Sequence, residues 1–275
     1  MKFLKSLLLT AFIVSLGTMS QAQSVDEILD GYYELIGGKE AWNKVEGIKF
    51  VGKINQGGME IPLEIVQTKS GESYSKASFQ GMSFMQGVYD GETLWNTNFQ
   101  TMKPEKVTSE DLENHKLSLN DFPDALINYK ENNYTAEYIG TETFDGTDAY
   151  KIKLVKEQKT VDGAKQDDVE FYFFEVDSGA MIGQQQEITS GPMAGVISEV
   201  KYSDYEEHEG LYFPMTMTQG VKDGQSSPIT VESIELNPEF DKEMLNFPEE
   251  GAEVEEEMDM EVAPPVKKKK ADGKN

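Results

Sequence analysis

Apolar and polar residues alternate along much of the chain with a period of two, which predicts β-strands that have one buried and one solvated face. In the run 59–65, for example, every odd-numbered residue is apolar, and Glu60 and Glu64 stand between them. Alternation of this kind is typical of antiparallel sheets. We therefore expect about ten strands between Gly47 and Pro238. The clearest other runs are 48–54, 150–154, 211–218 and 229–236.

Turn signals separate these runs and predict short connections of the meander type. Glycine and Asp-Gly pairs tolerate the left-handed backbone that tight hairpin turns need. The pairs are Gly57-Gly58, Asp90-Gly91, Asp145-Gly146, Asp162-Gly163 and Asp223-Gly224.

Three segments have helical rather than strand periodicity. Residues 24–45 repeat apolar side chains every three or four positions after a capping Ser24, and Gly37-Gly38 interrupts them. Residues 109–120, with Ser109 as N-cap, and residues 122–129 predict two shorter helices. The expected fold class is therefore mainly β (α+β), with the N-terminal and mid-chain helices covering the concave face of a curved sheet.

The first 22 residues predict a secretory signal peptide. Lys2 and Lys5 precede an apolar run at 7–16, and Ser20 and Ala22 supply the small residues of a cleavage site. The run is shorter than the ~20 residues that span a bilayer, although an uncleaved anchor is the alternative. We expect a protein exported to the periplasm of a Gram-negative envelope, with no transmembrane segment after cleavage.

The last 27 residues lose this periodicity. Eight acidic residues between 249 and 261 precede Pro264-Pro265 and the lysine run 267–270. Such composition buries too little apolar surface to order itself. The predicted organisation is a signal peptide at 1–22, one domain at 23–248 and a disordered tail at 249–275.

Composition excludes several classes of function. The chain has 25 lysines, no arginine and no cysteine, and a formal net charge of −25. An acidic surface repels nucleic acid, whose binding needs a basic face. The absence of cysteine excludes disulfides, thiolate nucleophiles and thiolate metal sites.

We find no recognisable catalytic or metal-binding motif, and we expect no enzyme and no cofactor. The two histidines, His115 and His208, lie on different predicted elements, and we expect both to be solvated. The glycines between 179 and 195 lack the ending of a phosphate-binding loop. A carboxylate pair brought together by folding would reopen an enzymatic interpretation, since sequence cannot locate such a pair.

The chain carries a surplus of aromatic residues and methionines in its predicted strands. Residues 82–88 and 171–174 place apolar side chains on both faces of a strand. Methionine adapts to varied apolar partners. These residues either fill a core or line a cavity for an acyl chain, and composition alone leaves both open.

Four groups of residues resemble a known family. Together they are similar to the outer-membrane lipoprotein-sorting proteins of Gram-negative envelopes, the LolA/LolB-like superfamily, and above all to its divergent periplasmic members from Bacteroidota-type bacteria. The resemblance covers about residues 24–248. The groups are 36–42 with 47–50, 87–95, 203–205 with 210–214, and 234–238 with 247–248.

The resemblance implies an unclosed, curved antiparallel β-barrel that holds the acyl chains of lipoproteins or lipids between sheet and helices. The lack of cysteine excludes a lipid-anchored receptor of the LolB type. A non-carrier β-scaffold that docks an envelope protein is the alternative function. The candidate ligand-binding residues are Phe84, Trp95, Met102, Leu126, Tyr129, Phe171, Phe173, Phe213, Met215 and Met217.

Overall fold

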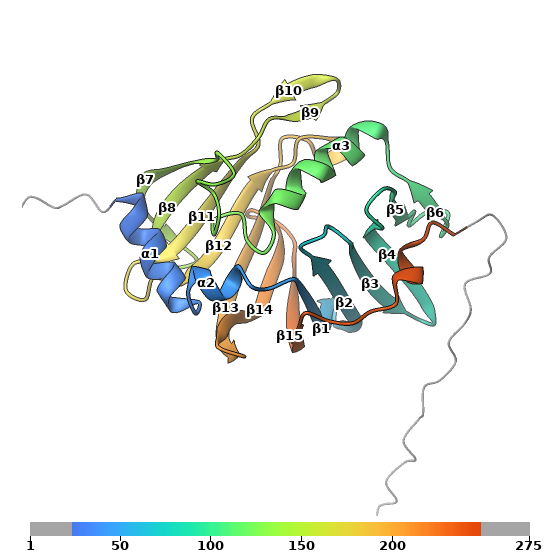
Figure 1. Ribbon diagram of the computed structural model, residues 1–275, viewed down its shortest axis with the longest axis horizontal. Coiled ribbons are helices and arrows are strands. Elements are labelled where there is room, and N and C mark those ends of the chain that lie inside the picture. Colours follow the sequence, from blue (N-terminus) through green and yellow to red (C-terminus); the bar gives the residue numbers. More distant parts are fainter. Residues whose placement is uncertain (1–23, 249–275) are drawn as a thin grey trace, which may run out of the picture.

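The computed structural model describes residues 24–248. A single antiparallel sheet of thirteen strands dominates it (Figure 1). A separate two-stranded hairpin consists of β9 (Lys159–Val161) and β10 (Ala164–Gln166). The strands of the large sheet are β1 (Gly47–Gln56), β2 (Met59–Thr68), β3 (Ser73–Phe79), β4 (Met82–Tyr89), β5 (Leu94–Thr97), β6 (Pro104–Lys106), β7 (Thr135–Phe144), β8 (Thr147–Val155), β11 (Val169–Glu175), β12 (Met181–Glu187), β13 (Ile197–His208), β14 (Leu211–Val221) and β15 (Ser226–Leu236).

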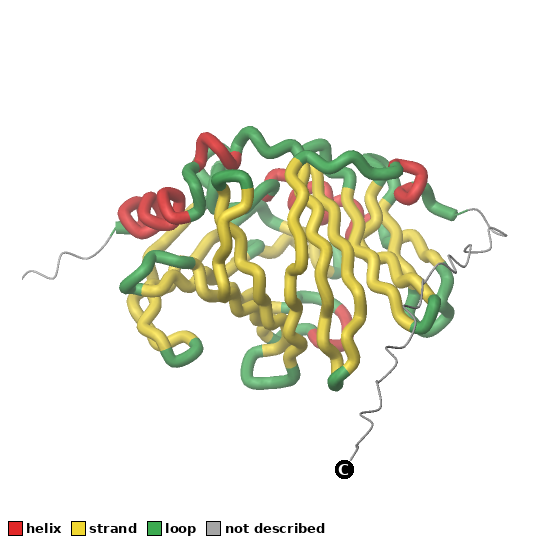
Figure 2. The backbone as a smooth tube through the Cα atoms, turned by 90° about the horizontal axis from the view of Figure 1, so that it is seen from below, coloured by secondary structure: helices red, strands yellow, loops and turns green. Residues whose placement is uncertain are grey.

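The strand order is β6-β5-β4-β3-β2-β1-β15-β14-β13-β12-β11-β8-β7. Strands β1 and β15 pair in the middle, with Ile48 opposite Leu236 and Ile54 opposite Ile229. The two edge strands, β6 and β7, do not pair with each other, and the sheet bends as an unclosed row of strands (Figure 2). The mainly antiparallel, unclosed architecture expected from the sequence is confirmed.

The number of strands exceeds the expected ten. Strands β6, β9 and β10 have three residues each and β5 has four, which is too short for a period of two to be recognised. The expected turns are correct. Asp145, Asp162 and Asp223 all have φ between 49° and 57°, the left-handed backbone that a tight turn demands.

The N-terminal segment forms α1 (Val25–Leu35) and the single turn α2 (Lys39–Trp42). Ser24 caps α1 by accepting from the Glu27 amide, and the Glu27 carboxylate accepts from the Ser24 amide. The predicted apolar stripe is buried against the sheet.

The mid-chain region contains one of the two predicted helices. Helix α3 spans Ser109–Ser118, and its N-cap is Thr108 instead of Ser109, because the Thr108 hydroxyl accepts from the Asp111 amide. The predicted helix at 122–129 is wrong. This segment consists of turns, in which the Asp124 carboxylate accepts from the Leu126 amide and replaces a helical hydrogen bond.

The sheet has two faces that differ in what packs on them. We call the face that carries Phe50, Tyr172 and Phe213 the inner face, because α1, α2 and residues 122–134 pack against it. On the outer face, the C-terminal segment 237–248 covers β2 to β5, where Trp95 and Leu245 are both buried. The segment includes the short helix η3 (Lys242–Leu245).

A third, smaller cluster lies on the outer face of β7, β8 and β11. Phe144 stacks on Phe173 with ring centroids 4.2 Å apart. A side chain at position 183 would meet the Phe144 ring at 2.2 Å, which explains the glycine there.

The predicted signal peptide and the predicted acidic tail lie outside the described residues. Within residues 24–248, no helix has the length and apolar character needed to cross a membrane.

Candidate apolar binding face

The inner face is covered unevenly. Over β8, β11, β15 and the Phe213 end of β14 it is buried beneath α1 and residues 122–134, and Ile152, Tyr172 and Phe174 are almost fully shielded. Tyr33 of α1 fastens this covering by donating to the main-chain oxygen of Leu126 at 2.6 Å. This half of the inner face is an ordinary closed core.

The other half, over β1 to β4, remains accessible. The pairing register places one apolar side chain after another on the same inner face, and most of them are only half-buried. Met82 is 45% exposed although it belongs to this row. The row consists of Phe50, Ile54, Ile61, Leu63, Ile65, Ala77, Phe79, Met82 and Phe84.

Residues of β14 extend this surface toward the closed half. Phe213 packs on Phe50, with ring centroids 5.9 Å apart, and is itself buried. Met215 and Met217 follow it along the inner face and are half-buried. A continuous apolar surface therefore runs from the core to the exposed row.

Helix α3 links the two halves of the protein on this side. Near its N-terminus, both carboxylate oxygens of Glu110 accept from main-chain amides of the β9–β10 hairpin at 2.9 Å. Asn114 exchanges two hydrogen bonds with the main chain of Thr160. Figure 1 shows α3 running across the molecule between the hairpin and the β1–β5 half.

Toward its C-terminal end, α3 rests on turns of the other half. His115 packs edge-on against Tyr89, with ring centroids 4.7 Å apart, and Leu119 lies against Gly71. No residue of α3 is fully buried. Few contacts therefore hold the helix along its length, while both ends are attached.

The two histidines lie in different surroundings. His115 is half-buried and its Nε2 has no hydrogen-bond partner in the described structure, so burial lowers the pKa of its imidazole. The expectation that it is exposed is therefore wrong. His208 ends β13 beside the exposed Glu209. Among residues 24–248 no group of three or more metal-ligating side chains comes together.

A polar cluster borders the closed half of the inner face. The Lys156 ammonium, in a side chain only 8% exposed, lies 2.8 Å from Asp121, 3.2 Å from Asp168 and 2.7 Å from Glu170. These carboxylates raise the pKa of Lys156, against the effect of burial. Each carboxylate is thus ion-paired, and the cluster has a structural explanation that needs no bound substrate.

Asp124 lies near this cluster and has a different partner set. Its carboxylate accepts from the Leu126 amide at 2.7 Å and from the Tyr32 hydroxyl at 3.2 Å. Burial raises the pKa of this carboxyl to about 6, and Glu170 and Asp121 add to the rise.

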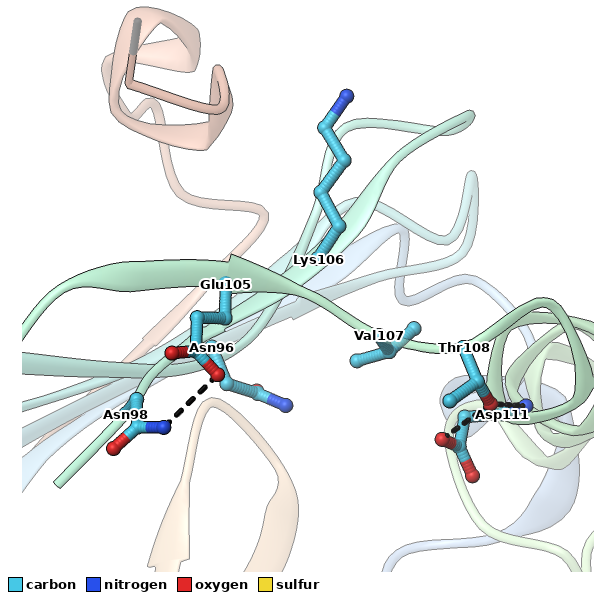
Figure 3. A pocket seen from close by; sticks show the side chains of 7 residues that line it. All are labelled: Asn96, Asn98, Glu105, Lys106, Val107, Thr108 and Asp111. Carbon is cyan, nitrogen blue, oxygen red and sulfur yellow. Dashed lines mark hydrogen bonds between the residues drawn. The ribbon is translucent and has the colours of Figure 1, made fainter. Parts of the chain in front are cut away.

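Two small pockets lie elsewhere. One, of about 240 Å³, is formed where β5, β6 and the start of α3 meet, and polar side chains dominate it (Figure 3). Asn98 donates to Glu105 there, and Thr108 donates to Asp111. The other, of about 160 Å³, is lined by outer-face residues such as Lys201 and Thr218. Neither includes a residue of the exposed apolar row.

The structure places four of the ten candidate ligand-binding residues on the inner face, one on β4 and three on β14. These are Phe84, Phe213, Met215 and Met217. Met102 lies in the β5–β6 loop and is 38% exposed. Leu126 and Tyr129 belong to the buried segment that covers the closed half.

The other three candidates lie on the outer face. Trp95 packs beneath the C-terminal segment, and Phe171 and Phe173 belong to the cluster around Phe144. An alternating strand has two faces, and Tyr172 and Phe174 occupy the inner one instead. Where both faces are apolar, the sequence does not indicate which face points inward.

Sequence reasoning missed most of the exposed row. Leu63 and Ile65 were identified as the apolar side of a strand, but nothing marked that side as incompletely covered. Coverage depends on which distant segments reach β2 and β3, and this is a property of the tertiary structure.

Comparisons with known proteins find similarity to solved structures alone. No family model matches the chain, and no curated protein matches it. The structural neighbours are LolA superfamily proteins and outer membrane lipoprotein-sorting protein domains. These two neighbours carry the name of the superfamily that the sequence resembles.

Three solved structures illustrate the likeness. A LolA superfamily protein from Nitrosomonas europaea has a TM-score of 0.47 at 12% identity, over 82% of this chain and 98% of that one. An outer membrane lipoprotein-sorting protein domain from Vibrio parahaemolyticus has a TM-score of 0.46 at 10% sequence identity, and the match covers 80% of this chain and 95% of that one. A DUF1329 family protein from Desulfovibrio piger has a TM-score of 0.46 at 14% sequence identity, and the match covers 80% of this chain and 97% of that one.

Proposed function

We propose that this protein is a periplasmic carrier that binds the acyl chains of lipoproteins or lipids on the inner face of its half-barrel and performs no chemistry on them. The observation that supports the proposal is the half-buried apolar row on β1 to β4. Contiguous apolar surface left open to water generally marks a place where a partner binds.

The energetics of burial suit such a ligand. Each methylene removed from water contributes roughly 0.8 kcal/mol. An acyl chain of about 15 methylenes would therefore gain up to ~12 kcal/mol before the costs of ordering are subtracted. Shape-adaptable methionines at Met82, Met215 and Met217 suit a flexible chain better than a rigid ligand.

In this proposal the helices cover the concave side of the sheet, and α3 is the covering element over the binding row. Leu126 and Tyr129 hold the closed half, while Phe84, Phe213, Met215 and Met217 contact the chain. Transport through the periplasm, with delivery to an envelope protein, follows from the expected signal peptide and from the resemblance. A role in outer-membrane lipoprotein sorting is the specific form we favour.

The alternative of a β-scaffold that docks a protein on its outer face has less support. The outer face of the central strands carries ion pairs, such as Lys49 with Glu64 at 3.0 Å and Lys53 with Glu232 at 2.8 Å. This face lacks the accessible apolar row of the opposite side.

The experiment blocks the apolar row with one large side chain and compares it with a matched substitution on the opposite face of the same strand. Ala77 faces inward on β3, whereas the neighbouring Ser78 faces outward, and both are half-buried. Binding of a dansylated fatty acid, followed by fluorescence, should be at least tenfold weaker for Ala77→Trp than for the wild type. The matched control Ser78→Trp should bind as the wild type does.

Two results would contradict the proposal. One is a wild-type protein that takes up no fatty acid and carries no lipid in native mass spectrometry after purification from its host. The other is an equal loss of binding in both variants at unchanged thermal stability.

A further inference from the structure

Five turns lie along one edge of the sheet. The hairpin turns β1–β2, β3–β4 and β5–β6 lie at the same edge, because β1 to β6 are consecutive antiparallel neighbours and every second turn therefore falls on the same side. The turns β12–β13 and β14–β15 reach this edge too, since Ser198 pairs with Val221 and Ile54 with Ile229. We call this edge the apolar rim. It consists of residues 55–59, 79–82, 98–103, 188–196 and 222–226.

The rim gathers the exposed large hydrophobic residues of the described structure. Eight such residues occur between 24 and 248, and six of them lie in the rim. Phe99, at the tip of the β5–β6 loop, is 65% exposed. The two outside it are Ile139 on β7 and Tyr212 on β14. The six rim residues are Met59, Met82, Phe99, Met102, Met193 and Val196.

The rim is also depleted of negative charge, in a protein whose formal net charge is −25. Its five turns contain one carboxylate, Asp223, and two lysines, Lys103 and Lys222. A sixth connection at this edge, residues 156–168 between β8 and β11, carries four carboxylates and three lysines and is hydrogen-bonded to α3, so the rim is only the part of the edge from β6 to β12.

The turns at the opposite edge differ sharply. They carry a carboxylate in every connection between strands of the large sheet. A ten-residue strand spans about 33 Å, so these charges are screened from the rim at a Debye length of ≈ 8 Å. They are Glu72, Asp90, Glu92, Asp145, Asp177 and Glu209.

The rim continues directly into the apolar row. Phe99 stacks on Phe84 of the row with ring centroids 5.6 Å apart, and Met82 pairs with Phe79. Apolar surface therefore extends without interruption from the loop tips to the inner face.

We propose that the apolar rim docks on the surface of a phospholipid bilayer. Exposed Phe and Met side chains at loop tips can enter the headgroup region, as the apolar side of an interfacial segment does. The near absence of carboxylates removes repulsion from anionic lipids, and the two lysines attract them. This inference goes beyond the proposed function, because the bilayer surface is a partner distinct from the bound acyl chain.

The test is vesicle flotation with the full chain and vesicles of phosphatidylethanolamine and phosphatidylglycerol. The double variant Phe99→Ser/Met102→Ser should reduce the bound fraction at least fivefold. Ile139→Ser/Tyr212→Ser removes the two exposed large apolar residues outside the rim and should leave the bound fraction unchanged. Thermal unfolding of each variant checks that the fold is retained.

A second measurement locates the contact. Phe99→Trp should show tryptophan fluorescence quenched by lipids brominated on their acyl chains, whereas Tyr212→Trp should not. A wild type that does not float, or an equal loss in both double variants, would overturn the proposal. So would concentration-dependent dimerisation that the rim variant abolishes without any vesicle binding, since the rim would then join two copies.

Failure here is distinguishable from failure of the carrier function. Fatty-acid uptake is measured without vesicles, and the Phe99→Ser/Met102→Ser variant keeps the inner-face residues around Ala77. Flotation without fatty-acid uptake would support the rim and contradict the carrier.

Discussion

The indole N–H of Trp95 donates to the main-chain oxygen of Leu245 at 2.9 Å, across 150 residues of sequence. This bond fastens the C-terminal segment to the outer face of β5, and Leu245 is almost completely buried among Val66, Tyr74 and Trp95. The segment thus supplies a core to the half of the sheet whose inner face is left open.

The first prediction concerns this anchor. Leu245→Ala should lower the free energy of unfolding by about 2–5 kcal/mol, because it leaves a cavity at a buried site. Phe240→Ala, at a half-buried position of the same segment, should cost less. Chemical denaturation measures both, and equal small effects would show that the segment contributes little to stability.

The second prediction concerns the carboxyl of Asp124. Its pKa is raised to about 6 in the folded protein, from 3.8, so the folded state holds the proton more tightly than the unfolded chain. This group's contribution to stability is therefore present below pH 3.8 and is lost as the pH rises to about 6.

Asp124→Asn removes that loss and keeps an acceptor for the Leu126 amide. The free energy of unfolding of the variant minus that of the wild type should rise by at most about 3 kcal/mol between about pH 4 and 6. Above that range the difference should level off. Urea unfolding at several pH values measures the difference. A constant difference across this range would contradict the raised pKa.

The third prediction concerns the contact of α3 with the sheet. Burial lowers the pKa of His115 from 6.5, so the unfolded chain holds the proton more tightly than the folded protein. The stability that neutral His115 contributes is present above pH 6.5 and is lost as the pH falls toward its folded pKa.

His115→Phe keeps an aromatic ring against Tyr89 without a titrating group. Amide hydrogen exchange in residues 109–118 should accelerate on going from pH 7.5 to 5.5 in the wild type, after correction for intrinsic rates, and should change less in the variant. Exchange in β14, away from α3, serves as the internal control. The same acceleration in both proteins would show that His115 does not control this contact.

Several features of the fold were predictable because they depend on residues close in sequence. The alternation at 59–65 indicates a strand with one apolar face, and Asp-Gly pairs indicate turns. The Ser24–Glu27 capping box indicates the start of a helix. The turns at 122–129 were not predicted, because the sequence pattern there is compatible with a helix. The Asp124 side chain competes with that helix by accepting a hydrogen bond from the Leu126 amide.

The antiparallel strands, their turns and the N-terminal helix could be predicted from the sequence, since periodicity and backbone preference are local properties. Which face of each strand is covered, and by what, depends on how distant segments pack in the folded chain. Phe173 and Phe213 look alike in sequence, yet one packs outward on Phe144 and the other inward on Trp42. The accessible row and the apolar rim exist because distant segments cover some apolar surfaces and leave others open, and burial is a sum over the whole chain.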